Sequence, residues 1–190
     1  QAVHAALDEV DPTIFVYGEG WTAGDSPLPK AQRALKANLQ ALPGIAAFND
    51  DLRDGVKGHW SEKADRGFVS GNDSVRADIH FGVVGAVQHP QVKMEAVRLS
   101  EVAWAKEPTQ SIQYVSCHDD LTLWDKLAAA NPDASETERI RMHKLALAIV
   151  LTAEGTRVAR ELAEWPDLLL GSVEVLDPQE EAVMLKALLK

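Results

Sequence analysis

Apolar and polar residues follow one another along the chain in stretches that are typical of helices and of strands in turn. Within the first ten residues, three apolar side chains have the spacing of an amphipathic helix: Val3, Leu7 and Val10. Asp11-Pro12 ends that pattern, and the β-branched and aromatic run 13–17 predicts a buried strand. A short helix is expected over 30–41, and a second strand over 45–48.

The middle of the chain, residues 53–108, has the weakest pattern. It is rich in glycine and polar residues and predicts mostly irregular structure, with helical turns near 74–82 and 92–97. A loop of this length inside a compact domain is uncommon, and it is often functional when it is ordered. We therefore expect this stretch to be a long insert in the regular framework.

The clearest strand signal, residues 111–117, follows this insert and ends in the polar run 118–120. Farther along, Ser135 and Glu138 form a capping box that predicts the start of a helix. Several apolar residues after it have the spacing of one helix face: Ile140, Leu145, Ala148, Ile149 and Leu151. This segment is expected to pack that face on the core.

The last part of the chain continues the alternation of helices and strands. A helix over 156–164, a strand over 168–175 and a final helix with Asp177 as its N-cap are expected. Strands that alternate with helices predict an α/β fold with mainly parallel strands.

Composition and charge narrow the classes of partner. The 190 residues are 46% hydrophobic and 25% charged, which is typical of a globular protein. The formal charge of -10 disfavours nucleic acid and anionic membrane surfaces, and no apolar run approaches the roughly 18 residues that cross a bilayer. The single cysteine, Cys117, excludes an internal disulfide and is expected in the core.

Carboxylates follow each of the three predicted strands. Glu19 follows the first, Asp50 and Asp51 the second, and Asp119 and Asp120 the third. In a parallel barrel the carboxyl ends of all strands gather on one face, which carries the catalytic groups. Two neighbouring carboxyl groups can serve as the acid and the stabilising anion of glycoside hydrolysis. Acidic residues at strand ends are also common as helix caps and as solvated loop residues, so this pattern alone leaves both interpretations open.

The residues around these carboxylates resemble a known family. Val16 to Trp21 (Val-Tyr-Gly-Glu-Gly-Trp) resembles the region around the acid/base glutamate of the α-amylase family, glycoside hydrolase family 13. Tyr114 to Asp125 looks like the later region that carries the transition-state-stabilising aspartate. Pro43 to Asp54 and Trp104 to Gln110 resemble the type I pullulanase branch of that family. The four stretches occur in the expected order within residues 1–155.

The resemblance implies a role for each of five residues. Glu19 would be the general acid/base, and Asp119 would stabilise the positive charge that develops on the sugar ring. Trp21 would shape the sugar site and His118 would donate a hydrogen bond to sugar hydroxyls, although Trp21 as plain core and His118 as a structural histidine stay open. Asp120 stands where many relatives have asparagine, which leaves its part in substrate binding less defined.

The resemblance also implies an incomplete catalytic domain. Residues 1–155 would form the second half of a (β/α)8 TIM barrel, roughly strands 5 to 8 with a long insert, and 156–190 a divergent closing segment. The family's nucleophile lies in a Gly-Phe-Arg-x-Asp pattern on the fourth strand, and this pattern does not occur in the sequence. We therefore expect a piece of a longer chain, with the N-terminal half of the barrel missing.

The expected function is hydrolysis of α-1,6-glucosidic linkages in pullulan and branched α-glucans by a retaining mechanism. Without the nucleophile, the chain alone is expected to be nearly inactive. The α-glucan substrate would be its ligand, and no organic cofactor is needed. The alternative is a non-catalytic α-glucan-binding module that keeps the sugar-contacting residues.

Other sites have weaker signals. Calcium is conceivable on Asp50, Asp51 and Asp73, because it prefers hard oxygen ligands. The six histidines lack the spacing of a transition-metal site. Trp60 and Trp104, both in the predicted insert, could stack on sugar rings, but packing in the core is the favoured interpretation.

Overall fold

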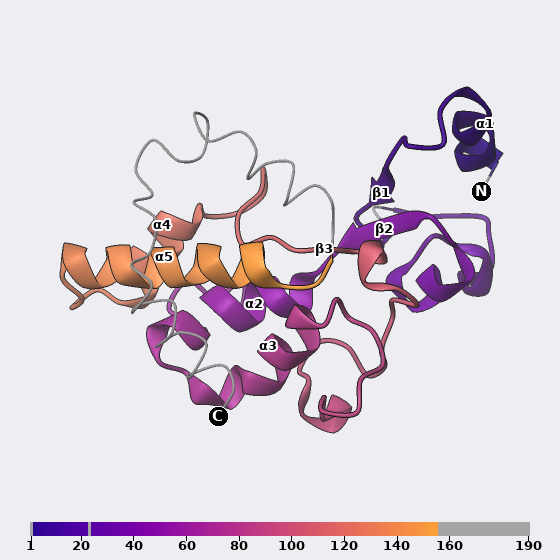
Figure 1. Cartoon of the computed structure of the whole chain (residues 1–190). Helices are drawn as coiled ribbons and strands as arrows, with labels where there is room; N and C mark the ends of the chain where they lie inside the picture. Colours follow the sequence, from indigo (N-terminus) through magenta and orange to yellow (C-terminus); the bar gives the residue numbers. More distant parts are fainter. Residues whose placement is uncertain (1, 23, 156–190) are drawn as a thin grey trace.

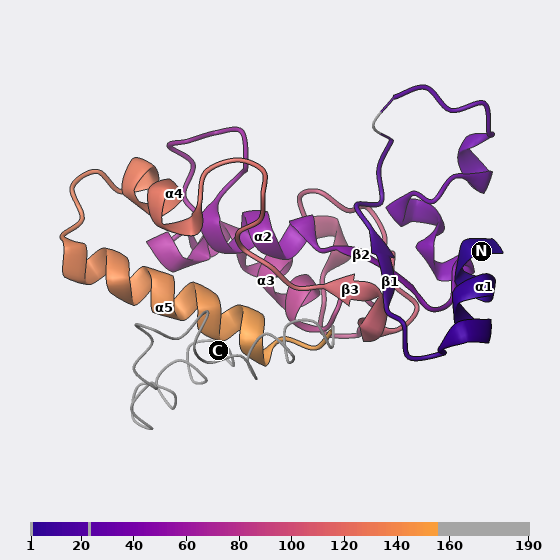
Figure 2. The ribbon, with the colours of Figure 1, turned by 90° about the horizontal axis from the view of Figure 1, so that it is seen from above.

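The computed structural model describes residues 2–22 and 24–155 of the 190-residue chain. A small parallel sheet lies between helix α1 at one end and the group of helices α2 to α5 at the other (Figures 1 and 2). The predicted α/β class with parallel strands is confirmed. The elements predicted over 156–190 lie outside the described residues.

The sheet has three strands in the order β1-β2-β3: β1 (Val16–Gly18), β2 (Ile45–Phe48) and β3 (Ser111–Ile112). Both pairs are parallel, with Val16 opposite Ile45 and Phe48 opposite Ile112. The predicted bounds of the second strand are confirmed. The third strand is much shorter than predicted, because β2 gives way to a helix after Asn49 and leaves no backbone partner beyond Ile112.

The helix that follows β2 was not predicted. α2 (Asp50–Lys57) begins at Asn49, whose side chain accepts a hydrogen bond from the Leu52 amide at 3.0 Å. All eight residues of α2 are buried, including its charged ones. Its charged side chains therefore face protein groups and not solvent, and the helix belongs to the centre of the fold.

The other helices surround α2. α3 (Arg76–Val83) packs along it, and α4 (Leu123–Ala130) packs against α5 (Glu136–Thr152). α1 (Ala2–Val10) stands apart and buries no residue. The short helix predicted over 30–41 is two 3₁₀ segments, Lys30–Gln32 and Lys36–Ala41, because the chain is extended at Arg33 and Leu35. Four further 3₁₀ turns lie between α2 and β3: Phe68–Ser70, Asp73–Val75, Met94–Ala96 and Pro108–Gln110.

α5 confirms the predicted capping box. The Ser135 hydroxyl accepts from the Glu138 amide, and the Glu138 carboxylate accepts from the Ser135 amide at 2.8 Å. The buried face consists of Ala146, Ala148 and Ile149. Ile140 and Leu151, expected on that face, are exposed, because 3.6 residues per turn place them on the side of the helix opposite Ile149, whereas Ala153, farther along the chain, packs on the core.

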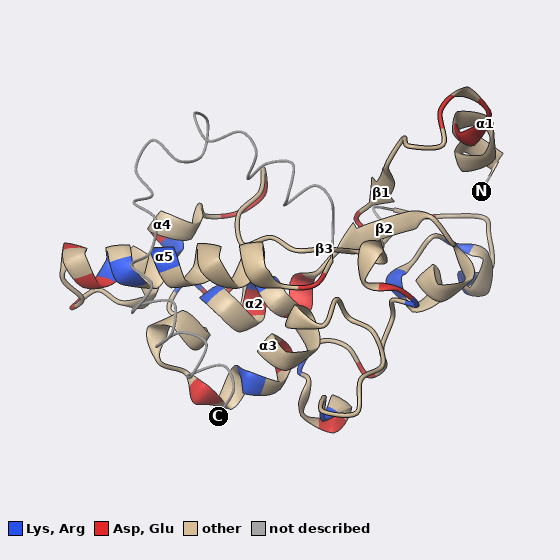
Figure 3. Cartoon of the chain, in the orientation of Figure 1, with Lys and Arg blue, Asp and Glu red and all other residues tan. Residues whose placement is uncertain are grey.

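The buried side chains form two apolar clusters. One joins α2 to α4 and α5 and contains Leu52, Val56 and Leu127; the other, with Phe81 and Trp104, lies beside the sheet. Trp104 is thus a core residue, as favoured from the sequence. Among the described helices, none is both long and apolar enough to cross a bilayer. Acidic positions mark α1, the start of α5 and the loop after β3, while basic positions are scattered over several elements (Figure 3).

Candidate active site

Residues at the carboxyl ends of β1 and β3 meet beyond the sheet. Glu19 directly follows β1, and His118 and Asp119 lie in the loop between β3 and α4. His118 Nε2 lies 4.0 Å from Glu19 Oε1 and 3.4 Å from Asp119 Oδ1. The side chains of this trio are partly or largely exposed, which leaves their polar atoms open to a ligand. Two carboxyl groups a hundred positions apart are thus brought together by the parallel sheet.

Trp21 is tied to the same group. Its indole Nε1 donates a hydrogen bond to Glu19 Oε2 at 3.0 Å. The side chain is 47% exposed, so the interpretation of Trp21 as plain core is wrong. The Lys36 ammonium lies over the indole ring, 4.7 Å from its centroid. The ring is therefore held from one side while it remains accessible beside a carboxylate.

The loop after β3 brings further exposed groups to the site. Asp120 adopts the left-handed region with φ at 64°, a conformation that aspartate and asparagine tolerate better than most residues. Cys117 is exposed, so its expected place in the core is wrong. The reason is that β3 ends at Ile112 and the chain has left the sheet before it reaches residue 117. Its Sγ donates to the Asp119 carbonyl at 3.6 Å.

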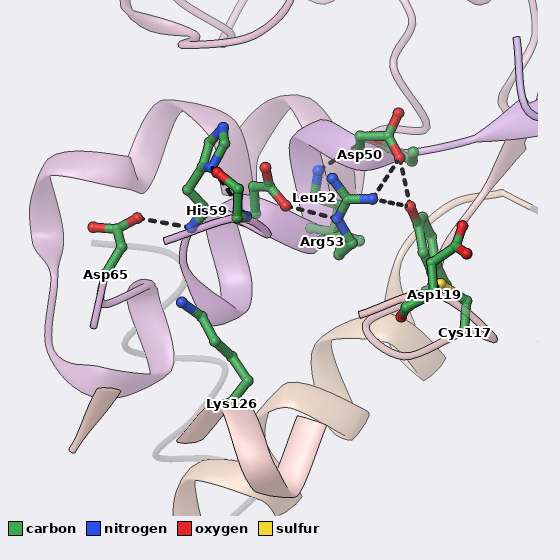
Figure 4. Close-up of polar contacts among 12 residues, drawn as sticks. Asp50, Leu52, Arg53, His59, Asp65, Cys117, Asp119 and Lys126 are labelled. Carbon is green, nitrogen blue, oxygen red and sulfur yellow. Dashed lines mark hydrogen bonds and ion pairs between the residues drawn. The ribbon is translucent and has the colours of Figure 1, made fainter. Parts of the chain in front are cut away.

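A buried ionic network lies beneath the exposed trio, and sequence reasoning missed three of its four members. Asp50 accepts hydrogen bonds from Arg53 and from the Tyr114 hydroxyl, and it forms an ion pair with Lys36. Arg53 Nη1 also donates to Tyr114 at 2.6 Å (Figure 4). The network links the start of α2 to the segment after β3 and to the loop after β1, the two segments that carry Asp119 and Glu19.

Burial shifts the pKa values of this network. Loss of hydration lowers the pKa of Lys36 to about 8, although the charge of Asp51 favours the ammonium. Loss of hydration also raises the pKa of the Tyr114 hydroxyl, against the opposing effect of Arg53. For Arg53, burial works against the charged form, but the hydrogen bond and charge of Asp54 outweigh it and raise the pKa. Arg53 is therefore the permanent cation of the network, and Lys36 the cation that can lose its proton.

The acids proposed for calcium have protein partners in this structure. Asp51 is 2% exposed and accepts from Ser100 at 2.8 Å and from Trp104 Nε1 at 3.2 Å, while its other oxygen has no hydrogen-bond partner. Burial raises the pKa of Asp51, and the two hydrogen bonds oppose that shift. Asp73 pairs with Arg76 instead. Within the described part of the chain, the one group of side chains with the geometry to hold a cation is Glu19, His118 and Asp119, whose ligating atoms all lie within 4.8 Å of one another.

A pocket of about 840 Å³ opens beside these residues. This volume falls in the range of roughly 300–1,000 Å³ that is common for small-molecule sites. Its wall combines aromatic, acidic and basic side chains from several elements: Trp21, Lys36, Ala37, Asp50, Asp51, Arg53, Asp54, Trp60, Leu99, Ser100, Glu101, Val102, Trp104, Asp119 and Asp120. Trp60 is 49% exposed, so its expected packing in the core is wrong: the residue belongs to a surface loop after α2. Such a mixture suits a polar ligand with apolar faces.

A parallel α/β framework here gathers carboxylates from two strand ends beside a pocket with exposed indoles, an arrangement that glycoside hydrolases use. No protein-family model matches the chain. Curated relatives do: the pullulanase of Bacillus subtilis strain 168 is 38% identical over 144 residues, which cover 76% of this chain and 19% of that protein. The pullulanase of Klebsiella pneumoniae is 30% identical over 181 residues, covering 78% of this chain and 16% of that protein.

Solved structures agree with the curated relatives. A pullulanase from Paenibacillus barengoltzii, crystallised with maltohexaose and α-cyclodextrin, matches 82% of this chain with 42% identity and a TM-score of 0.72. The type I pullulanase of Bacillus subtilis with maltose matches the same share with 34% identity and a TM-score of 0.72. The chain is a pullulanase-type segment, and it spans about a fifth of the length of the relatives it matches.

Proposed function

We propose that this chain supplies the acid/base half of a pullulanase-like active site, which hydrolyses α-1,6-glucosidic linkages in pullulan and branched α-glucans. The observation that carries the proposal is the meeting of Glu19 and Asp119 beyond the ends of β1 and β3, with His118 between them. Similarity to pullulanases, several of them solved with maltooligosaccharides, gives the substrate class.

The geometry suits a division of roles. Glu19, held by the Trp21 indole, would protonate the glycosidic oxygen and then activate water for the second step. Asp119 would balance the positive charge that develops on the ring, and His118 would donate to a hydroxyl of the same sugar. Trp21 would pack on a sugar face, and Asp120, on the pocket wall, would accept from hydroxyls.

The parallel order β1-β2-β3 supports the placement of these strands as consecutive members of a (β/α)8 barrel of the α-amylase family. In that arrangement residues 1–155 belong to strands 5 to 8 and 156–190 form a divergent closing segment. The retaining mechanism needs an aspartate nucleophile, and the sequence has no Gly-Phe-Arg-x-Asp pattern to provide it. The chain would then depend on the N-terminal half of the barrel for turnover.

The test is the hydrolysis of pullulan, measured as released reducing ends, by the 190-residue chain alone and by the chain joined to a pullulanase N-terminal barrel half. The chain alone should be nearly inactive and the joined enzyme active. Full activity of the chain alone would contradict its dependence on a second half.

In the joined enzyme, Glu19→Gln should reduce kcat by about 10²–10⁴-fold, because the amide cannot exchange a proton with the glycosidic oxygen. The control is Glu9→Gln, an exposed glutamate of α1 that should leave kcat unchanged. A loss of less than about tenfold for Glu19→Gln would refute the acid/base role.

A further inference from the structure

Lys36 packs against the loop that carries Glu19. We propose that Lys36 is a positioning residue for the acid/base: it holds the loop Glu19-Gly20-Trp21 in the orientation from which Glu19 serves the glycosidic oxygen. This role rests on the proposed function, because the group that Lys36 positions is the proposed acid/base. Lys36 acts through Trp21 and Glu19, and not by contact with the reacting atoms.

Three parts of Lys36 contact this loop. Its backbone amide donates a hydrogen bond to the Gly20 carbonyl at 2.8 Å. Its stem packs on Gly20, which has a positive φ of 78° and where a Cβ would lie 2.8 Å from Lys36 Cγ. Its ammonium lies 4.7 Å from the centroid of the Trp21 ring, a distance at which a cation is attracted to the ring face. The backbone, stem and charge of one residue therefore hold Gly20 and Trp21, directly beside Glu19.

The contact with the Trp21 ring reaches the Glu19 carboxyl group. Trp21 Nε1 donates to Glu19 Oε2 at 3.0 Å, whereas Glu19 Oε1 lies 4.0 Å from His118 Nε2. The indole thus fixes one oxygen of the carboxyl group and leaves the other on the side of the trio. Proton transfer depends on the position of the carboxyl group. A displaced indole should therefore lower its efficiency.

Lys36 is itself held by α2. It forms an ion pair with Asp50, and the two side chains are 17% and 9% exposed, so the pair is largely enclosed by protein. Asp50 also accepts hydrogen bonds from Arg53 and from the Tyr114 hydroxyl, as the dashed lines in Figure 4 show. Tyr114 belongs to the segment that continues to Asp119. Lys36 therefore connects the loop of the acid/base to the segment of the stabilising aspartate.

The charge of Lys36 can be removed by a change of pH. Burial lowers the pKa of Lys36 to about 8, so the ammonium should be lost as the pH rises through this value. The charged and titratable groups around Lys36 are Asp50, Asp51, Arg53 and Asp54 of α2, Tyr114 after β3, and Glu19 beyond Trp21. Burial raises the pKa of Tyr114, and Arg53 is a permanent cation, so neither changes its charge near pH 8. Lys36→Arg keeps a cation at this position and separates Lys36 from the four acids.

The first experiment follows the Trp21 indole N–H by NMR in the 190-residue chain, with the resonance assigned by its loss in Trp21→Phe. In the wild type the resonance should shift with a midpoint near pH 8, and in Lys36→Met and Lys36→Arg this shift should be absent. At pH 7 the indole proton should exchange with water about two- to fivefold faster in Lys36→Met, as expected for the loss of one cation–π contact, and Lys36→Arg should restore slow exchange. The control is Lys30→Met, at an exposed lysine that does not line the pocket, which should behave as the wild type.

The second experiment compares two substrates in the joined enzyme. Pullulan needs a proton on its leaving oxygen, whereas α-maltotriosyl fluoride releases fluoride, which leaves as an anion without one. Lys36→Met should lower kcat/KM about tenfold for pullulan and less than about twofold for the fluoride, and Lys36→Arg should recover most of the loss. A merely structural role of Lys36 would lower both values alike.

The outcomes separate this role from the proposed function. If the joined wild-type enzyme hydrolyses pullulan, but Lys36→Met leaves the exchange of the Trp21 indole or the ratio of the two kcat/KM values unchanged, the positioning role is overturned and the proposed function stands. If the joined wild-type enzyme does not hydrolyse pullulan, the proposed function fails and the role of Lys36 fails with it.

Discussion

Lys126→Met tests how the charged side chain of α4 supports the loop after α2. Lys126 is 1% exposed, and its ammonium donates to the Glu62 carbonyl at 2.5 Å and to the Lys63 carbonyl at 3.3 Å. Methionine keeps the apolar stem in the core but has no donor. The substitution therefore removes one strong and one weak charge-assisted hydrogen bond with little change of volume.

The magnitude follows from these two bonds. A hydrogen bond from a charged donor contributes about 1.5–3 kcal/mol. The net loss of stability is smaller than the sum of the two bonds. Glu62 and Lys63 are exposed, so their carbonyls can bind water in the variant, and folding of the variant no longer removes water from an ammonium group. We expect the free energy of unfolding to fall by about 1–2 kcal/mol, and the His59 amide to exchange its hydrogen faster in the variant.

Urea unfolding followed by far-ultraviolet circular dichroism measures the change. Lys106→Met, at an exposed lysine, is the control and should change stability by less than about 0.5 kcal/mol. Burial lowers the pKa of Lys126, so the unfolded chain binds more protons between that lowered pKa and 10.5. Over this window the stability of the wild type should rise with pH relative to Lys126→Met. Equal stability of the Lys126 and Lys106 variants would refute the anchoring role.

Two further predictions concern the helices behind the site. Ser135→Ala should lower the free energy of unfolding by about 1 kcal/mol, because the side-chain bonds of the capping box of α5 are lost. The comparison is Thr137→Ala, two residues farther along in the first turn of α5, with both variants measured by urea unfolding. The hydrogen bonds from the Ser135 hydroxyl and amide lower the pKa of Glu138, so the part of this difference that comes from the hydroxyl–carboxylate bond should be lost as the pH falls through that lowered value, while the bond from the Glu138 amide to the Ser135 hydroxyl remains. Equal stability of the Ser135 and Thr137 variants would contradict the cap. Leu127→Ala, at a fully buried position between α2 and α5, should cost about 2–5 kcal/mol, whereas Leu151→Ala, half exposed on α5, should cost much less; similar losses would place Leu127 outside the core.

The elements that sequence reasoning found are those with local signals. The second strand is a short apolar run between turn residues, and α5 begins with a capping box, so both could be predicted from neighbouring residues. α2 was not predicted, since it is buried on all sides although five of its eight residues are charged; the partners of its acids and of Arg53 lie elsewhere in the chain or within the helix itself. Amphipathic patterns report an exposed face, and α2 has none.

The candidate site shows the same division. The approach of Glu19 and Asp119 could be foreseen, because parallel strands bring their carboxyl ends to one edge. Lys36, Arg53 and Lys126 could not, because a lysine or arginine is normally exposed and only a distant partner makes its burial possible. Trp60 was misplaced for the opposite reason: an indole is usually buried, and only the three-dimensional position of its loop leaves it in water.

The distance along the chain between Glu19 and Asp119 has a consequence for synthesis. Ribosomes add about 5–20 residues per second, so Asp119 is made roughly 5–20 seconds after Glu19. β1 can pair with β2 before β3 has been synthesised. Until then, Glu19 lacks its neighbours His118 and Asp119. The carboxylate trio therefore cannot form before the loop after β3 has been made, and its formation could serve as a reporter that a nascent chain has joined β3 to the sheet.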